Sequence, residues 1–132
     1  MSRVMVVEDE PIVLSNIAEI LKFFGLDPIC AFDGARAKEL LLELSESREG
    51  PPSLIISDIM MPNMDGMALL DFVRSYEPTA HIPFLVLSAK SDSQDLRQAF
   101  SKGATEYLVK PFEVEDLIDT VRKTLETSAK PS

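Results

Sequence analysis

Acidic side chains follow two strongly apolar segments of this 132-residue chain. Glu8 and Asp9 come directly after the apolar run at residues 4–7, and Asp58 comes after the run at residues 54–57. A carboxylate at the end of a buried strand is poorly solvated yet accessible, which suits a nucleophile or a metal ligand. Because a strand-end aspartate can also cap the following turn, the Asp58 segment by itself leaves both interpretations open.

The elements that must position these residues alternate along the chain. The apolar runs lack polar alternation, as expected for strands that are buried on both faces. Helical periodicity separates them, and Pro28 favours an edge position for the second strand. Short strands joined by helices indicate an α/β fold: a flavodoxin-like (βα)5 three-layer sandwich with one parallel five-stranded sheet in the order 2-1-3-4-5. We expect strands at residues 3–8, 28–32, 54–57, 83–87 and 105–109, and helices that begin near Pro11, Asp33-Gly34, Gly66, Ser91-Asp92 and Val114. Helical periodicity predicts that the first helix turns inward Val13, Ile17, Ile20, Leu21 and Phe24, and that the fourth turns inward Leu96, Ala99 and Phe100.

Composition limits the class of protein. The length suits one domain, and 45% apolar residues indicate a globular chain. A net charge of -9 argues against direct nucleic-acid binding, because phosphate contacts need a basic face. The single cysteine, Cys30, is interpreted as a small buried hydrophobe. With no signal peptide or membrane helix recognised, the expected location is cytoplasmic and no membrane partner is expected.

The predicted sheet brings five polar side chains to one rim. Ligands of such sheets bind beyond the carboxyl ends of the strands, at the point where the strand order reverses. Strand one delivers Glu8 and Asp9, strand three Asp58, strand four Ser88 and strand five Lys110. Two carboxylates about 4 Å apart repel by roughly 4 kcal/mol at an effective dielectric near 20, so protonation or a cation must relieve them. Oxygen ligands with space for water favour Mg²⁺ as that cation.

The rim also carries groups that suit a phosphoryl group. Lys110 supplies a mobile positive charge and Ser88 a hydroxyl donor, both of which bind phosphoryl oxygens. Asp58 is the carboxylate best placed to attack phosphorus and to form an acyl phosphate. The residues therefore point to phosphoryl transfer onto Asp58.

Four motifs resemble one family. The chain is similar, from Val4 to about Leu125, to the receiver domain of two-component response regulators. The matching segments are Val-Glu-Asp-Glu at 7–10, Ser-Asp-Ile-Met-Met-Pro-Asn-Met-Asp-Gly at 57–66, Leu-Ser-Ala at 87–89 and Gly-Ala-Thr-Glu-Tyr-Leu-Val-Lys-Pro-Phe at 103–112. One variation is Glu8, which stands where many members carry Asp.

The resemblance implies a role for each matching residue. It implies a signalling switch that is not an enzyme in the usual sense, since it assists only its own phosphorylation and dephosphorylation. Asp58 would accept a phosphoryl group from a phosphohistidine of a sensor histidine kinase or a histidine phosphotransfer protein. A downstream protein or a fused output domain would be the second partner. The implied residues are Glu8, Asp9, Asp58 and the main-chain carbonyl of Met60 for Mg²⁺, Ser88 and Lys110 for the phosphoryl group, Ser88 and Tyr107 for switching, Ala89 for phosphoryl access, and a cis Lys110-Pro111 bond.

Three rival functions are weighed against this hypothesis. A receiver-like module that has lost phosphorylation is disfavoured, since every expected site residue is present. A haloacid dehalogenase-type phosphatase would need a second acid two residues after Asp58, where Met60 stands. A flavodoxin-type flavin carrier would place a phosphate against the acids at residues 8–10. We expect residues 1–127 to form the receiver and 128–132 a flexible tail or the start of a linker. The sequence leaves open whether the protein acts alone or as part of a longer chain.

Overall fold

The computed structural model describes residues 2–61, 63–89 and 93–129, and within them five parallel strands form one sheet. The strand order is β2-β1-β3-β4-β5, which confirms the predicted flavodoxin-like order. Among the described residues, no helix has the length and apolar character needed to cross a bilayer. The elements are β1 (Arg3–Val7), α1 (Pro11–Phe23), β2 (Asp27–Ala31), α2 (Gly34–Glu46), β3 (Leu54–Asp58), α3 (Gly66–Ser75), the 3-10 turn η1 (Glu77–Thr79), β4 (Phe84–Ala89), α4 (Ser93–Ser101), β5 (Glu106–Lys110) and α5 (Val114–Ala129).

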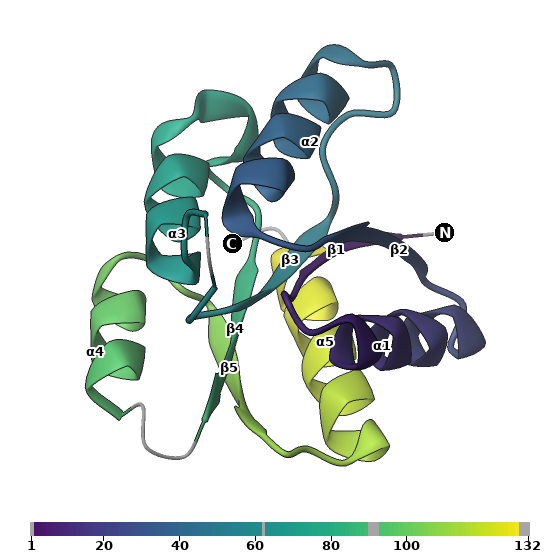
Figure 1. Cartoon of the computed structure of the whole chain (residues 1–132). Coiled ribbons are helices and arrows are strands. Elements are labelled where there is room, and N and C mark those ends of the chain that lie inside the picture. The colour runs from purple at the N-terminus through teal and green to yellow at the C-terminus, as the bar shows by residue number, and fades with distance from the viewer. Residues whose placement is uncertain (1, 62, 90–92, 130–132) are drawn as a thin grey trace.

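Helices cover both faces of the sheet and bury two separate cores (Figure 1). Successive residues of a strand point to opposite faces, so Met5 and Val7 enter one core while Val4 and Val6 enter the other. Helices α2, α3 and α4 close the first core, and α1 and α5 close the second. This double coverage explains the unbroken apolar runs of the central strands.

Local sequence explains where the helices begin. Pro11 occupies the first turn of α1, where a missing backbone N–H costs nothing. The carboxylate of Asp33 accepts a hydrogen bond from the backbone N–H of Arg36, and Asp65 accepts one from Ala68. These two N-caps fix the starts of α2 and α3. The Ser91-Asp92 cap expected for α4 lies outside the described residues.

Several side-chain placements differ from the sequence-based expectation. Cys30 was expected to be buried, but it is exposed because β2 is an edge strand. On α1 Leu14 is buried together with Ile17, Ala18 and Leu21. Val13 and Ile20 lie at the margin of the apolar face and remain partly accessible. On α4, Phe100 is 41% exposed, and Ala99 alone among its described residues is buried. Each of the five strands differs from its expected limits by one or two residues at one end or at both.

Helix α4 is fastened to the rest of the protein at its carboxyl end. The guanidinium of Arg74, on α3, donates two hydrogen bonds to the carbonyl of Gly103, at 2.8 and 3.0 Å. It donates two more, to the carbonyls of Ala80 and Ile82. Burial lowers the pKa of Arg74. Lys102 adds an exposed ion pair to α3. Since Ala99 is the buried residue among those described on α4, the bonds from Arg74 to Gly103 and the Lys102–Asp71 pair supplement a small apolar contact.

Candidate phosphoryl-acceptor site

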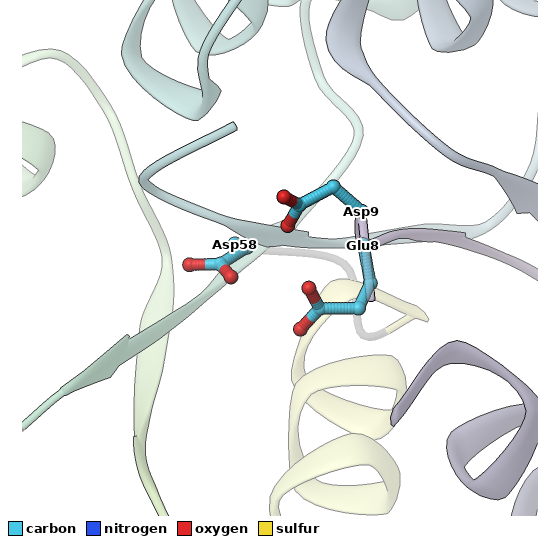
Figure 2. A group of neighbouring side chains, drawn as sticks. All are labelled: Glu8, Asp9 and Asp58. Carbon is cyan, nitrogen blue, oxygen red and sulfur yellow. The ribbon is translucent and has the colours of Figure 1, made fainter. Parts of the chain in front are cut away.

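Three carboxylates gather where β1 and β3 end. Glu8 and Asp9 follow the last residue of β1, and Asp58 is the last residue of β3. Because β1 and β3 are paired in parallel, with Val7 opposite Ser57, the three residues reach the same rim (Figure 2). One oxygen atom of each carboxylate lies within 4.8 Å of the others. The structure thus brings together the acidic residues that the sequence places at strand ends.

Lys110 joins two of these acids. Its Nζ donates a hydrogen bond to Glu8 Oε1 at 2.6 Å and another to Asp58 Oδ2 at 2.8 Å. The side chain of Glu8 is fully buried, and that of Asp58 is 15% exposed. Glu8 Oε2 accepts a hydrogen bond from the backbone N–H of Glu10. The ion pair between Glu8 and Lys110 is a contact that strand-end positions alone do not reveal.

The pKa values of Glu8 and Lys110 are both raised, but for different reasons. Burial raises the pKa of Glu8, the hydrogen bond from Lys110 opposes this rise, and the charge of Asp58 adds to it. Burial alone would lower the pKa of Lys110, but hydrogen bonds to Asp58 and Glu8 outweigh it, so this pKa is raised. Lys110 therefore stays protonated, and its single positive charge does not balance the three carboxylates at the rim.

The donor set fits a hard divalent cation. Three carboxylates meet within 4.8 Å and one ammonium offsets only part of their charge. Carboxylate and carbonyl oxygens are the ligands that Mg²⁺ prefers, and the ion retains several waters where protein ligands are few. Met60 is the second residue of the loop that follows Asp58, and its backbone N–H donates to Asp58 Oδ1 at 3.4 Å.

The other predicted site residues come from β4 and β5. Ser88 and Ala89 end β4, which pairs with β3 so that Asp58 lies opposite Leu87. Ser88 is fully buried, and its hydroxyl has no hydrogen-bond partner among the described residues. Tyr107 is 44% exposed and packs edge-to-face against Phe100 at 5.9 Å between ring centroids. The Lys110-Pro111 peptide bond is cis.

Sequence reasoning missed the contacts that hold the loop after Asp58. The segment Asp33-Gly34 was interpreted only as a turn into a helix, yet both residues contact this loop. Asp33 was identifiable as a helix cap, but its second contact joins residues 30 positions apart. No local pattern signals such a pairing, because it depends on how α2 packs on the sheet.

Comparison with known proteins gives a consistent family match. A family model described as the response regulator receiver domain matches residues 4–122. The DNA-binding dual master transcriptional regulator RpaA of Synechocystis is 36% identical over 95% of this chain and 49% of its own length. The sensor histidine kinase TmoS of Ectopseudomonas mendocina is 39% identical over 87% of this chain and 11% of its own length. The chain thus spans half or less of these relatives.

A solved structure shows the same fold over the whole domain. The putative response regulator from Chloroflexus aurantiacus aligns with a TM-score of 0.86 and 28% identity. The alignment covers 95% of this chain and 98% of that one. The five-stranded fold of this chain is therefore the fold of that response regulator as well.

Proposed function

Because this chain belongs to the response regulator receiver domain family, we propose that Asp58 is its phosphorylation site. The main support for this proposal is that β1, β3 and β5 bring four side chains to one rim: Glu8, Asp9, Asp58 and Lys110. Family membership identifies the domain as a signalling switch of two-component systems and supports this function over the phosphatase and flavin-carrier alternatives. Residues 1–127 are proposed as the receiver, and 128–132 as a tail or the start of a linker.

The proposed reaction moves a phosphoryl group from a phosphohistidine to Asp58. A carboxylate oxygen of Asp58 attacks phosphorus, the P–N bond to the donor imidazole breaks, and an acyl phosphate forms. Glu8, Asp9, Asp58 and the Met60 carbonyl would hold Mg²⁺, which neutralises charge on the transferring group when bound. Lys110, already 2.8 Å from Asp58, shifts its hydrogen bonds to the phosphoryl oxygens.

The proposed switch uses the buried hydroxyl of Ser88. A phosphoryl group adds strong acceptors at Asp58, and Ser88 offers a donor that has no partner among the described residues. Movement of Ser88 toward the phosphate vacates space into which the ring of Tyr107 turns. Ala89 leaves room for the phosphoryl group. The surface of α4, β5 and α5 then changes, and that surface would control a partner or a fused output domain.

The phosphodonor is proposed to dock beside α1. An apolar groove there is lined by Val13, Asn16, Ile17 and Ile20 of α1 and by residues 110–112. Because Lys110 both lines this groove and contacts Asp58, a donor helix seated in it lies within reach of the acceptor. The occupant we propose is the phosphohistidine-bearing helix of a sensor kinase or phosphotransfer protein.

An intact-mass experiment tests the acceptor. The protein is incubated with Mg²⁺ and a small acyl phosphate, beside Asp58→Asn and the control Asp65→Asn, which alters a nearby acid that caps α3. We expect one phosphoryl adduct in the wild type and in Asp65→Asn, none in Asp58→Asn, and loss of the adduct with a chelator. An adduct that persists in Asp58→Asn would refute the assignment.

A further inference from the structure

The loop that joins Asp58 to α3 is here named the site loop, and its described residues are 59–61 and 63–65. It carries the carbonyl of Met60. We propose that the N-terminus of α2 positions this loop, so that Asp33 and Gly34 are positioning residues for the metal and phosphoryl site. The inference rests on the proposed function, which assigns metal coordination to Asp58 and Met60. Neither Asp33 nor Gly34 would itself touch the metal or the phosphoryl group.

The first supporting observation is a close backbone approach. A Cβ atom built on Gly34 would lie 2.0 Å from the carbonyl oxygen of Met64 and 2.9 Å from its carbonyl carbon. Real Cβ atoms keep at least 3.0 Å from such atoms, so an alanine at this position requires a shift of about 1 Å. Only glycine therefore allows the site loop to rest directly on the first turn of α2.

Hydrogen bonds reinforce this contact. The backbone N–H of Ala35 donates to the carbonyl of Asn63 at 3.0 Å. First-turn N–H groups lack a partner within their own helix, so the site loop satisfies one that α2 would otherwise leave open. The side-chain amide of Asn63 donates to Asp33 Oδ2 at 3.2 Å, while Asp33 Oδ1 caps α2 through Arg36. One carboxylate thus holds both the helix and the loop.

The site loop keeps a strained backbone. Asn63 has a φ of 50° and Met64 a φ of 81°, both in the left-handed region. Such a conformation costs a methionine roughly 1–3 kcal/mol and persists only where surrounding contacts fix it. The contacts with Asp33, Gly34 and Ala35 are adjacent to the strained residues and provide that support.

The other end of the site loop is also fixed. The backbone N–H of Gly66 donates to the carbonyl of Ile59 at 2.8 Å. A Cβ on Gly66 would lie 2.2 Å from the carbonyl oxygen of Asp58, so α3 begins directly against the acceptor residue. In the proposal, a displacement of about 1 Å at Met64 alters the position of the Met60 carbonyl in the same loop, because Ile59 and Gly66, at the two ends of that loop, are held together. Helix α2 supplies a rigid reference, because Ala37 and Leu41 are fully buried in the core.

The test measures metal affinity apart from stability. Mn²⁺ serves as the probe, its free concentration is followed by electron paramagnetic resonance, and urea unfolding reports stability. The variants are Gly34→Ala, which forces the shift, and Asp33→Asn, which keeps the cap but turns an amide toward the amide of Asn63. Two controls on α2 match them: Leu44→Ala weakens packing against the core, and Glu43→Gln removes an exposed negative charge.

We expect Gly34→Ala to weaken Mn²⁺ binding about tenfold, as substitutions behind metal ligands do, and Asp33→Asn to weaken it less. Both controls should bind as the wild type does, although Leu44→Ala unfolds at lower urea. Unchanged affinity in a folded Gly34→Ala would overturn the inference. If that variant does not fold, unchanged affinity in Asp33→Asn overturns it instead.

Two further outcomes separate this inference from its premise. A loss of affinity in Leu44→Ala equal to that in Gly34→Ala would mean general loosening and would overturn the positioning role. Failure of the wild type to bind Mn²⁺ would overturn the proposed metal site, and the inference with it. Binding by the wild type with no effect of the two positioning variants would overturn the inference alone.

Discussion

Substitution of Lys110 by alanine tests the electrostatics of the site most directly. The change removes the ammonium that donates at 2.6 Å to Glu8 and at 2.8 Å to Asp58. It leaves a fully buried glutamate and a nearly buried aspartate with no cationic side chain bonded to them among the described residues. We expect the variant to fold, because the sheet and both cores do not depend on the Lys110 side chain.

The size of the effect follows from burial. Removing one partner of a fully buried ion pair costs about 3–5 kcal/mol, whereas an exposed pair contributes less than about 1 kcal/mol. The Lys110 side chain is 24% exposed, while Glu8 is fully buried. We therefore expect the free energy of unfolding to fall by about 2–3 kcal/mol near neutral pH without Mg²⁺. The pKa of Glu8 should rise further, since the hydrogen bond that lowers it is gone.

Mg²⁺ should reverse much of this loss. In the wild type a cation competes with Lys110 for Glu8 and Asp58, but in Lys110→Ala it meets carboxylates without that competitor. We expect excess Mg²⁺ to raise the free energy of unfolding of the variant by about 1 kcal/mol more than that of the wild type. The assay is urea unfolding followed by far-ultraviolet circular dichroism, with and without the metal.

Lys102→Ala is the matched control. Lys102 also forms an ion pair, but its partner is Asp71 of α3, which is not one of the rim carboxylates, and the pair is more exposed. Its removal should cost less than about 1 kcal/mol and should not change the response to Mg²⁺. The reasoning is refuted if Lys110→Ala is as stable as the wild type without Mg²⁺, or if the metal stabilises both proteins equally.

Three further predictions follow from other contacts. Arg74→Met should lower the free energy of unfolding by about 2–3 kcal/mol and speed amide exchange at Gly103, because it leaves partly buried carbonyls without the donors that Arg74 supplies. Unchanged exchange would contradict the role of Arg74 in attaching the carboxyl end of α4. The pKa of Glu8 is raised in the folded state, so from about pH 4.3 upward the folded state binds more protons than the unfolded chain. The free energy of unfolding without Mg²⁺ should therefore fall as the pH rises above that value toward the raised pKa. Urea midpoints of Glu8→Gln should lack the part of this pH dependence that Glu8 causes. Ile20→Glu should slow phosphorylation by a cognate kinase, measured with radiolabelled donor, but not by a small acyl phosphate; equal slowing of both would contradict docking in the groove beside α1.

Much of the fold could be predicted from sequence because the cause is local. The central strands are buried on both faces, so each must read as an uninterrupted apolar run, as residues 4–7 and 54–57 do. Pro28 at the sheet edge and Pro11 at a helix start are similarly fixed by backbone chemistry. The boundaries moved by one or two residues, since strand ends depend on pairing partners that a single segment does not contain.

Side-chain burial was less predictable. The apolar face of α1 was placed correctly at Ile17 and Leu21, but Leu14 packs where Val13 was expected. Cys30 was expected inside and is exposed, because a residue on an edge strand has one open side. The spacing of apolar residues predicts which face of a helix or strand is apolar. The angle at which the element packs on the sheet decides which residues of that face are buried.

The sequence by itself determined which groups reach the rim. Parallel pairing carries the end of every strand to one edge, so the order of elements sufficed to collect Glu8, Asp9, Asp58 and Lys110. Only the tertiary structure decided how these groups share their charges, with Lys110 bonded to a buried Glu8 as well as to Asp58. It alone also revealed that α2 supports the loop after Asp58. The physical reason is that such contacts join residues far apart in the chain, at distances set by packing rather than by local pattern.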